Sequence, residues 1–222
     1  MTAVRWGMIG CGAVTSNKSA PAYSLVPGFR LSAVASRRRS TAVEYATARG
    51  IEHVFDHAHD LIRSPLVDAV YIATPPSSHR ALAIQVAAAG KPCCVEKPIA
   101  NNHADAEAMV HAFARAARPL FVAYYRRSLP RFAQVADWIG HGRIGTVRHV
   151  HWTLMRTPTP ADLAGQTGWR TDPNEAPGGY FDDLAGHGLD LFDQWVGPIV
   201  RARGVHLNQA GLYDVPDAVT GA

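Results

Sequence analysis

A short glycine loop near the N-terminus constrains the fold of this chain more than any other feature. The run Val4–Ile9 is typical of a buried strand, and the loop at residues 10–15 (GCGAVT) follows it and precedes a predicted helix. Gly10 permits a tight turn, and Gly12 lets backbone N–H groups at the helix start approach a pyrophosphate. Thr15 stands where this fingerprint usually has Gly or Ala. The loop predicts a dinucleotide-binding fold, and the alternative is a tight turn without a ligand.

Strand-like and helix-like segments alternate through the first half of the chain. We expect further strands at 30–36, 53–55, 68–73, 93–96 and 119–124, and helices at 40–49, 79–89 and 101–117. The run Asp68–Ala73 is apolar throughout, as in a sheet that is covered on both faces. This alternation predicts an α/β fold whose N-terminal domain, residues 1–124, is a Rossmann doubly wound parallel sheet.

The pattern changes after Tyr125. We expect helices at 129–139 and 181–196, an antiparallel strand with one solvated face at 146–156, an irregular stretch at 157–179 and a strand at 200–207. The second domain, residues 125–222, is therefore predicted as a partial C-terminal α/β (α+β) domain with a mostly antiparallel sheet. The last residues, 217–222, look like the start of another strand, so we expect a fragment of a longer protein or a sheet completed by a partner.

The composition describes an ordinary globular protein, with 47% hydrophobic and 18% charged residues. The chain has no apolar run near the roughly 18 residues that span a bilayer, and it starts with a strand where a signal peptide would be basic and then apolar. We therefore expect a cytoplasmic protein without a membrane partner. The formal charge of +4 is scattered, which argues against a nucleic-acid partner.

Cysteines and histidines give no metal or disulfide pattern. Cys11, Cys93 and Cys94 form neither a disulfide framework nor a CxxC pair, so we expect buried small hydrophobic side chains. The pairs at 57/59 and 149/151 are interpreted as surface or half-buried histidines, and no metal is predicted.

Three residues are candidates for chemistry. Lys97, in Glu96-Lys97-Pro98, follows a predicted strand and lies at the sheet edge where ligands bind, although a solvated loop lysine is the alternative. Asp183 and His187 are four apart on a predicted helix and share one face, so the imidazole is a plausible proton carrier. An ordinary Asp–His surface pair is the alternative there, and the preceding double glycine favours a functional site.

Five segments together resemble the Gfo/Idh/MocA oxidoreductases, the glucose–fructose oxidoreductase and inositol dehydrogenase group. They are the glycine loop, residues 72–76 with His79, the Glu-Lys-Pro triplet, residues 124–127 (YYRR), and the Gly-Gly-x-x-x-Asp-x-x-x-His segment that ends at His187. The resemblance implies a Rossmann domain that binds NAD or NADP, and a second domain on an open sheet that closes over a sugar, a polyol or a related substrate. It also implies a homodimer or homotetramer joined through the C-terminal sheet, and a cis Lys97–Pro98 bond.

The resemblance further implies that Lys97, Asp183 and His187 line the site of hydride transfer. Oxidation of an alcohol needs a hydride acceptor, a base and stabilisation of a developing oxyanion. We assign the proton to His187 and the polarisation of the oxygen to Lys97, with Asp183 orienting the substrate or the imidazole; the first two roles are exchangeable.

Ser36-Arg37-Arg38 at the end of the second strand indicates the cofactor. An acidic residue there would bind the ribose 2′-OH of NAD, whereas a hydroxyl with guanidinium groups suits the 2′-phosphate of NADP. NADP is therefore preferred over NAD, and the alternative is that the arginines only decorate a helix start. The predicted cofactor-binding residues are Gly10, Gly12, Ala13, Val14, Ser36, Arg37, Arg38, Thr74, Pro75, His79, Glu96 and Lys97.

These observations predict an NAD(P)-dependent dehydrogenase or reductase that acts on CH–OH groups of a sugar, polyol or related small molecule. A catalytically silent nucleotide-binding regulator on the same scaffold and a truncated inactive remnant are the alternatives. The presence of all three catalytic candidates argues against silence. Arg126 and Arg127 are interpreted as structural, and Trp169 with Arg170 as a weaker candidate for contact with a sugar ring.

Overall fold

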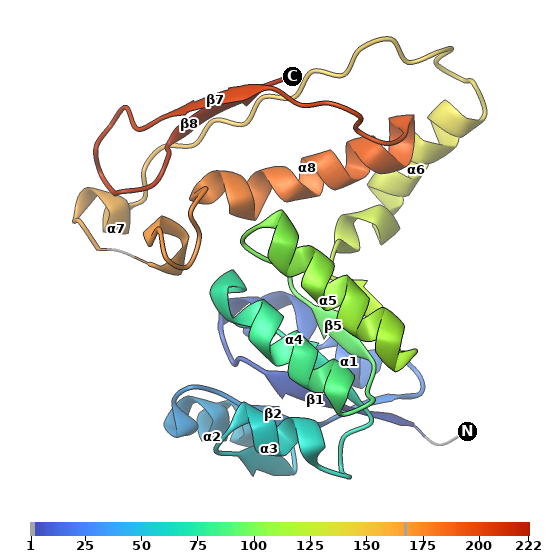
Figure 1. Ribbon diagram of the computed structural model, residues 1–222, viewed down its shortest axis with the longest axis vertical. Coiled ribbons are helices and arrows are strands. Elements are labelled where there is room, and N and C mark those ends of the chain that lie inside the picture. The colour runs from blue at the N-terminus through green and yellow to red at the C-terminus, as the bar shows by residue number, and fades with distance from the viewer. Residues whose placement is uncertain (1–2, 167) are drawn as a thin grey trace. The chain divides into compact units, whose positions relative to one another are not determined.

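The structure is a computed structural model that describes residues 3–166 and 168–222 (Figure 1). The chain divides into two compact units, Met1–Ala123 and Tyr124–Ala222. Each unit has its own secondary structure.

The first unit is built on one sheet of six parallel strands in the order β3-β2-β1-β4-β5-β6. The strands are β1 (Val4–Ile9), β2 (Phe29–Ala35), β3 (His53–Phe55), β4 (Ala69–Ile72), β5 (Cys93–Val95) and β6 (Leu120–Val122). β1 lies between β2 and β4, so the strand order reverses there. In open α/β sheets ligands bind at the carboxyl ends of the strands beside such a reversal. The predicted doubly wound parallel sheet is confirmed.

Helices cover both faces of this sheet. They are α1 (Ala22–Leu25), α2 (Arg39–Thr47), α3 (Ala58–Arg63), α4 (His79–Ala88) and α5 (His103–Ala116), with a short π-helix η1 (Thr15–Ser19) and a 3₁₀ turn η2 (Pro76–Ser78). The segment after the glycine loop is this π-helix, and the fully buried Thr15 donates its hydroxyl to the Gly12 carbonyl at 2.8 Å. Thr15, at the third position of the fingerprint, therefore makes a hydrogen bond within the glycine loop.

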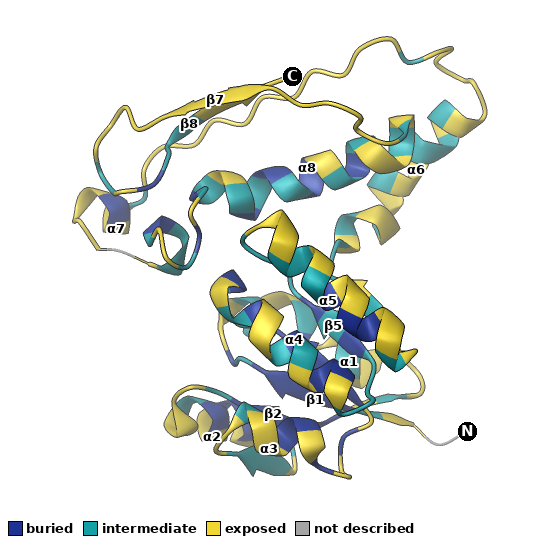
Figure 2. Cartoon of the chain, viewed as in Figure 1, coloured by how far each residue is buried: buried dark blue, intermediate teal, exposed yellow. Residues whose placement is uncertain are grey.

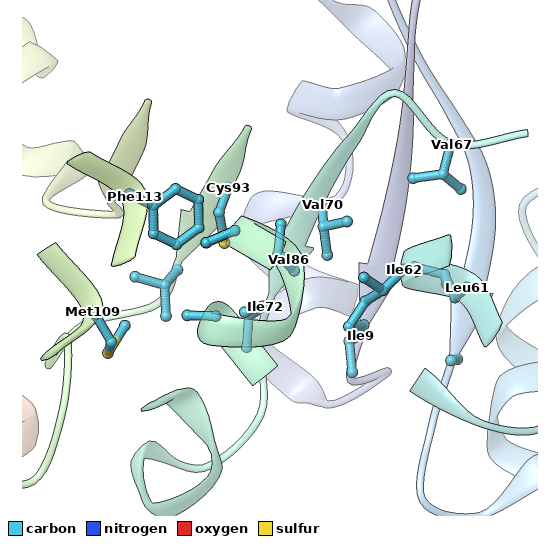
Figure 3. Close-up of a cluster of buried hydrophobic side chains, with 14 of the residues drawn as sticks. Ile9, Leu61, Ile62, Val67, Val70, Ile72, Val86, Cys93, Met109 and Phe113 are labelled. Atoms are coloured by element: carbon cyan, nitrogen blue, oxygen red, sulfur yellow. The ribbon is translucent and has the colours of Figure 1, made fainter. Parts of the chain in front are cut away.

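Neighbouring residues of each strand face opposite layers of the core. Ile9 and Ile72 pack with residues of α3, α4 and α5 such as Phe113, in the cluster that Figure 3 shows. Met8 and Tyr71, one residue earlier on the same strands, pack on the other face with the residues of α2. Both faces are thus apolar, which explains why these strands are continuous apolar runs in the sequence.

The second unit contains three α-helices, two 3₁₀ turns and one small sheet among its described residues. They are η3 (Tyr125–Ser128), α6 (Pro130–Gly140), α7 (Pro160–Leu163), η4 (Trp169–Thr171), α8 (Tyr180–Val196), β7 (Gly204–Leu207) and β8 (Ala218–Gly221). β7 and β8 pair antiparallel, as expected for this half of the chain. Every residue of β7 is exposed (Figure 2).

The predicted strand at 146–156 is wrong: no strand is assigned to these residues. The segment does alternate apolar and polar residues, but a strand also needs a neighbouring backbone to complete its hydrogen-bond ladder. In the part of the chain that the structure describes, β7 and β8 pair only with each other. Trp152 instead packs its ring against α8, where a Cβ added to Gly188 would lie 2.4 Å from it. The predicted strand at 200–207 is shorter and begins at Gly204.

The three cysteines carry free thiols; Cys11 and Cys93 are buried and Cys94 is half-buried. Burial raises the pKa of the Cys11 thiol to about 11, so it behaves as a small apolar side chain. None of the helices in the described residues is both long and apolar enough to cross a membrane.

Candidate active site

Gly10 and Gly12 have different surroundings in the glycine loop. Gly10 has φ +102°, and a Cβ added to it would lie 2.5 Å from the carbonyl oxygen of Ala73. The backbone of β1 passes so close to the end of β4 that only glycine fits. Gly12 is exposed, and a Cβ there would have no heavy atom within 4 Å. Packing within the chain therefore explains Gly10, whereas the space over Gly12 is open to a ligand.

The end of β2 carries positive charge beside the loop. The Gly10 N–H donates to the Ala35 carbonyl at 2.8 Å, so the loop and the Ser36-Arg37-Arg38 segment are adjacent. Arg37 and Arg38 are exposed, and α2 begins directly after them without an acidic residue in its first turn. Because cations lie unfavourably at the positive end of a helix dipole, this arrangement favours an anion.

His79 joins two loops at the same edge of the sheet. Its imidazole is fully buried; Nε2 lies 2.8 Å from the Thr74 carbonyl oxygen, and Nδ1 lies 3.0 Å from that of Pro98. Burial lowers the pKa of the imidazole, and the carbonyl contacts oppose this shift. Ser78 Oγ lies 2.7 Å from Thr74 Oγ1, which further orders the loop after β4. The ring of His79 is thus directed to the chain's own carbonyls.

Glu96 and Lys97 follow β5 beside these loops. The Tyr71 hydroxyl donates to Glu96 Oε1 at 2.6 Å, and the Lys97 backbone N–H donates to Glu96 Oε2 at 3.3 Å. Lys97 is half-buried, and the Lys97–Pro98 peptide bond is cis. Within the first unit, the loop, the arginines, Thr74-Pro75 and Lys97 therefore all lie at the carboxyl edge of one sheet.

The start of α8 in the second unit depends on a double glycine. Gly179 has φ +62°, and a Cβ on it would lie 2.8 Å from Val215 Cγ2. The Gly178 N–H donates to Asp182 Oδ2 at 2.8 Å, which stabilises the first turn of the helix. Burial raises the pKa of Asp182. These contacts set where the next turns of α8 place Asp183 and His187.

Asp183 and His187 are both buried on α8. Asp183 Oδ2 accepts a hydrogen bond from Arg170 Nε at 2.7 Å, and this guanidinium lies 4.3 Å from the centroid of the Trp169 ring. The shared face that the spacing predicts is thus present, and a cation from another segment pairs with the carboxylate.

Two aromatic rings flank the imidazole of His187. The Tyr124 and Tyr125 rings approach it edge-on at centroid distances of 6.2 and 5.1 Å. Burial raises the pKa of the Tyr124 hydroxyl above its ordinary value. The imidazole therefore lies beside these two ring edges, with Asp183 one turn before it and Asp190 one turn after it on α8.

Arg127 pairs with Asp190 on α8, with Nη2 2.6 Å and Nε 2.8 Å from its carboxylate oxygens. Its pKa is raised by this hydrogen bond. The pair joins η3 to α8 within the second unit, which agrees with the structural role expected for Arg127.

Sequence reasoning missed the contacts that hold the candidates in place, although it named Arg170 and the two tyrosines. These contacts join Ser19 to Tyr71, Tyr71 to Glu96, Arg170 to Asp183, and the Tyr124 and Tyr125 rings to His187. Tyr71 stands in an apolar run and is read there as core, so no local signal marks its hydroxyl. The Trp169-Arg170 pair and the Tyr124-Tyr125 pair are visible in the sequence, but nothing local identifies their partners: Asp183 is 13 residues from Arg170, and His187 is farther still from both tyrosines.

A six-stranded parallel sheet with a glycine loop at its strand-order reversal defines a Rossmann-fold dinucleotide-binding protein. Comparison with known families agrees with this class: residues 4–124 match the oxidoreductase family with an NAD-binding Rossmann fold, and residues 132–222 match the GFO/IDH/MocA C-terminal domain. The chain belongs to the Gfo/Idh/MocA oxidoreductase family.

Named relatives and solved structures are similar to this chain along most of its length. Oxidoreductase P35 of Formosa agariphila is 34% identical over 97% of this chain and 68% of its own length. Myo-inositol 2-dehydrogenase of Thermotoga maritima is 29% identical over 85% of this chain and 53% of its own length. The structure of a levoglucosan dehydrogenase in complex with NADH superimposes with a TM-score of 0.86 at 26% identity, covering 99% of this chain and 63% of that one. The chain therefore spans between about half and two thirds of the length of these relatives.

Proposed function

We propose that this protein is an NADP-dependent oxidoreductase that transfers a hydride between the nicotinamide and a hydroxyl or carbonyl carbon of a sugar or polyol. The observation that carries the proposal is the carboxyl edge of the first sheet, where the open space over Gly12, the exposed arginines and Lys97 lie together. The names of the relatives support the substrate class, since they include an inositol dehydrogenase and a levoglucosan dehydrogenase.

The residues of this edge fit a dinucleotide. The loop backbone at Gly12, Ala13 and Val14 would hold the pyrophosphate, because the space over Gly12 is one that a Cβ would fill. Thr74 and Pro75 border the same edge after β4. When bound, the cofactor supplies the hydride acceptor or donor. The protein supplies binding, orientation and proton transfer.

Lys97 and His187 are the proposed catalytic residues. The ammonium group of Lys97 polarises the substrate oxygen and stabilises its developing negative charge. His187 holds or accepts the proton at its imidazole, which its buried place on α8 shields from bulk water. Asp183 is fixed by Arg170, so we assign it the orientation of the substrate or of the imidazole.

The preference for NADP follows from Ser36, Arg37 and Arg38. Arginine makes bidentate, charge-assisted hydrogen bonds to phosphate. Arg37 and Arg38 are exposed directly before α2, whose first residue, Arg39, pairs with Asp56. Calorimetric titration with NADP and NAD tests this preference. We expect tighter NADP binding, and a loss of about 10- to 100-fold in NADP affinity in Arg37→Ala. Equal affinities, tighter NAD binding, or an Arg37→Ala protein with full NADP affinity would contradict it.

Turnover tests the activity itself. NADPH oxidation and NADP reduction should be followed against a panel of sugars, inositols and diols, with Lys97→Ala and His187→Ala as variants. We expect turnover that both substitutions suppress. Tight NADP binding without turnover of any panel member by the wild type would instead favour a silent nucleotide-binding regulator. A cytoplasmic location and a homodimer or homotetramer formed through the C-terminal sheet stay predictions of the sequence.

A further inference from the structure

The segment Glu96-Lys97-Pro98 is held by side chains from both layers of the first unit. Tyr71 belongs to the cluster on the α2 face of the sheet, and its hydroxyl reaches Glu96. His79 is the first residue of α4, which packs on the opposite face, and its ring reaches the Pro98 carbonyl. The residue between these two contacts is Lys97.

The hydrogen bond between Tyr71 and Glu96 is short, and Tyr71 is its donor. Tyr71 Oη lies 2.6 Å from Glu96 Oε1, a distance typical of a charge-assisted O–H···O⁻ hydrogen bond. Ser19 Oγ lies 2.8 Å from the same phenol oxygen; because tyrosine has one proton and a carboxylate only accepts, Ser19 donates to Tyr71 and Tyr71 donates to Glu96. The Tyr71 ring is buried and stacks on Tyr23 at 4.7 Å, so it has no alternative place.

On the opposite face of the sheet, the imidazole of His79 contacts two loops. His79 is fully buried, with one ring nitrogen 2.8 Å from the Thr74 oxygen and the other 3.0 Å from the Pro98 oxygen. The imidazole therefore lies between the loop after β4 and the loop after β5, and in its neutral form it donates its one N–H to one of these two carbonyls. Neither contact touches the side chain of Lys97, but together they fix the backbone on both sides of it.

We propose that Tyr71 and His79 are positioning residues for Lys97, acting through the Glu96 carboxylate and the Pro98 carbonyl. This inference rests on the proposed function, in which Lys97 acts on the substrate oxygen. Holding a reacting group in place matters because a displacement of about 1 Å can cost about 100-fold in rate. The clamp, defined as Tyr71, Glu96, His79 and Pro98, therefore acts on kcat more than on cofactor affinity.

Four variants separate the contacts. Tyr71→Phe removes only the hydroxyl that binds Glu96. Tyr23→Phe is its matched control, because it removes the hydroxyl of the half-buried ring that stacks on Tyr71. His79→Asn keeps an amide donor at the place of Nδ1, near Pro98, whereas His79→Gln keeps one at the place of Nε2, near Thr74. The clamp requires that His79→Asn behaves more like the wild type than His79→Gln does.

The first readout needs no turnover. The chain has three lysines, Lys18, Lys91 and Lys97, so the rate at which an amine reagent such as acetic anhydride labels each one can be followed by peptide mass spectrometry over a range of pH. Lys91 serves as the internal reference, since its Nζ donates to the Ser64 carbonyl at 2.7 Å, away from the clamp. We expect the labelling profile of Lys97 to change in Tyr71→Phe and His79→Gln and to match the wild type in Tyr23→Phe and His79→Asn.

The second readout is kinetic, on the full chain with whichever panel substrate is turned over. We expect kcat to fall about 10- to 100-fold in Tyr71→Phe and His79→Gln. In Tyr71→Phe, at a residue outside the predicted cofactor-binding set, we expect little change in the dissociation constant of NADP. An unchanged labelling profile of Lys97 in both variants, in proteins that circular dichroism shows to be folded, would overturn the clamp. Should the wild type neither bind NADP nor turn over any substrate while the profile changes as expected, the proposed function fails and the clamp stands.

Discussion

Gly10 and Gly12 lie two residues apart in one loop, and their surroundings predict opposite effects of the same substitution. A Cβ on Gly10 would lie 2.5 Å from the Ala73 carbonyl oxygen, at φ +102°, whereas a Cβ on Gly12 would meet nothing within 4 Å. Gly10→Ala should therefore damage the fold. Gly12→Ala should spare the fold and fill the space that we assign to the pyrophosphate.

The magnitude for Gly10→Ala has two parts. A side chain at positive φ costs about 1–2 kcal/mol, and overpacking against a backbone atom costs about 1–3 kcal/mol. Together they lower the free energy of unfolding by about 2–5 kcal/mol, which lowers the melting temperature by about 4–20 °C in a chain of this size. Gly12→Ala has neither part, so its free energy of unfolding should stay within about 0.5 kcal/mol of the wild type.

Urea unfolding followed by circular dichroism, together with calorimetric titration of NADP, measures both effects. We expect a lower unfolding midpoint only in Gly10→Ala. In Gly12→Ala we expect an unchanged midpoint and a loss of NADP affinity of about 5- to 150-fold, from an overpacking cost of about 1–3 kcal/mol. Full NADP affinity in Gly12→Ala, or equal stability of Gly10→Ala and the wild type, would refute the reasoning.

Three further substitutions test the packing and the charges. Phe113→Ala, in the core cluster of the first unit where Phe113 is 2% exposed, should cost about 3–5 kcal/mol in urea unfolding; a smaller cost would mean that the cluster is not close-packed. Arg170→Ala should cost about 1–3 kcal/mol because it leaves the buried Asp183 carboxylate without its cation, and adding Asp183→Asn should restore part of the loss; no recovery would contradict the pairing. Arg5 holds the pKa of Asp68 below its ordinary value of 3.8, so the stability advantage of the wild type over Asp68→Asn should be full at neutral pH and vanish as the pH falls below that value; an advantage that persists in acid would refute it.

The first sheet could be predicted because its signals are local. Apolar runs such as Ala69–Ile72 pack on both faces, and the loop at residues 10–15 stands directly between β1 and the next helical segment. The segment 146–156 shows where this reasoning ends. Its alternation is real, but a strand exists only when another backbone completes its ladder, and that partner is not encoded in the segment itself.

In the candidate site, too, some residues could be predicted from the sequence and others could not. Lys97, Asp183 and His187 could be found because they stand at fixed distances from glycines and strand ends. Their partners could not, because Tyr71 meets Glu96 across 25 residues and Arg170 meets Asp183 across 13, through contacts that only the folded chain creates. When a tyrosine stands in an apolar strand, the sequence does not indicate that its hydroxyl donates a hydrogen bond to a carboxylate.

Transfer of deuterium tests the central claim most directly. NADPH that carries deuterium at its transferable position is incubated with the full chain and a panel of ketoses, inosose-type ketones and sugar aldehydes, and the products are analysed by mass spectrometry. We predict deuterium on the alcohol carbon of at least one product, and its near-complete loss in Lys97→Ala. Bound NADPH that labels no product, or equal labelling by the wild type and Lys97→Ala, would contradict the account.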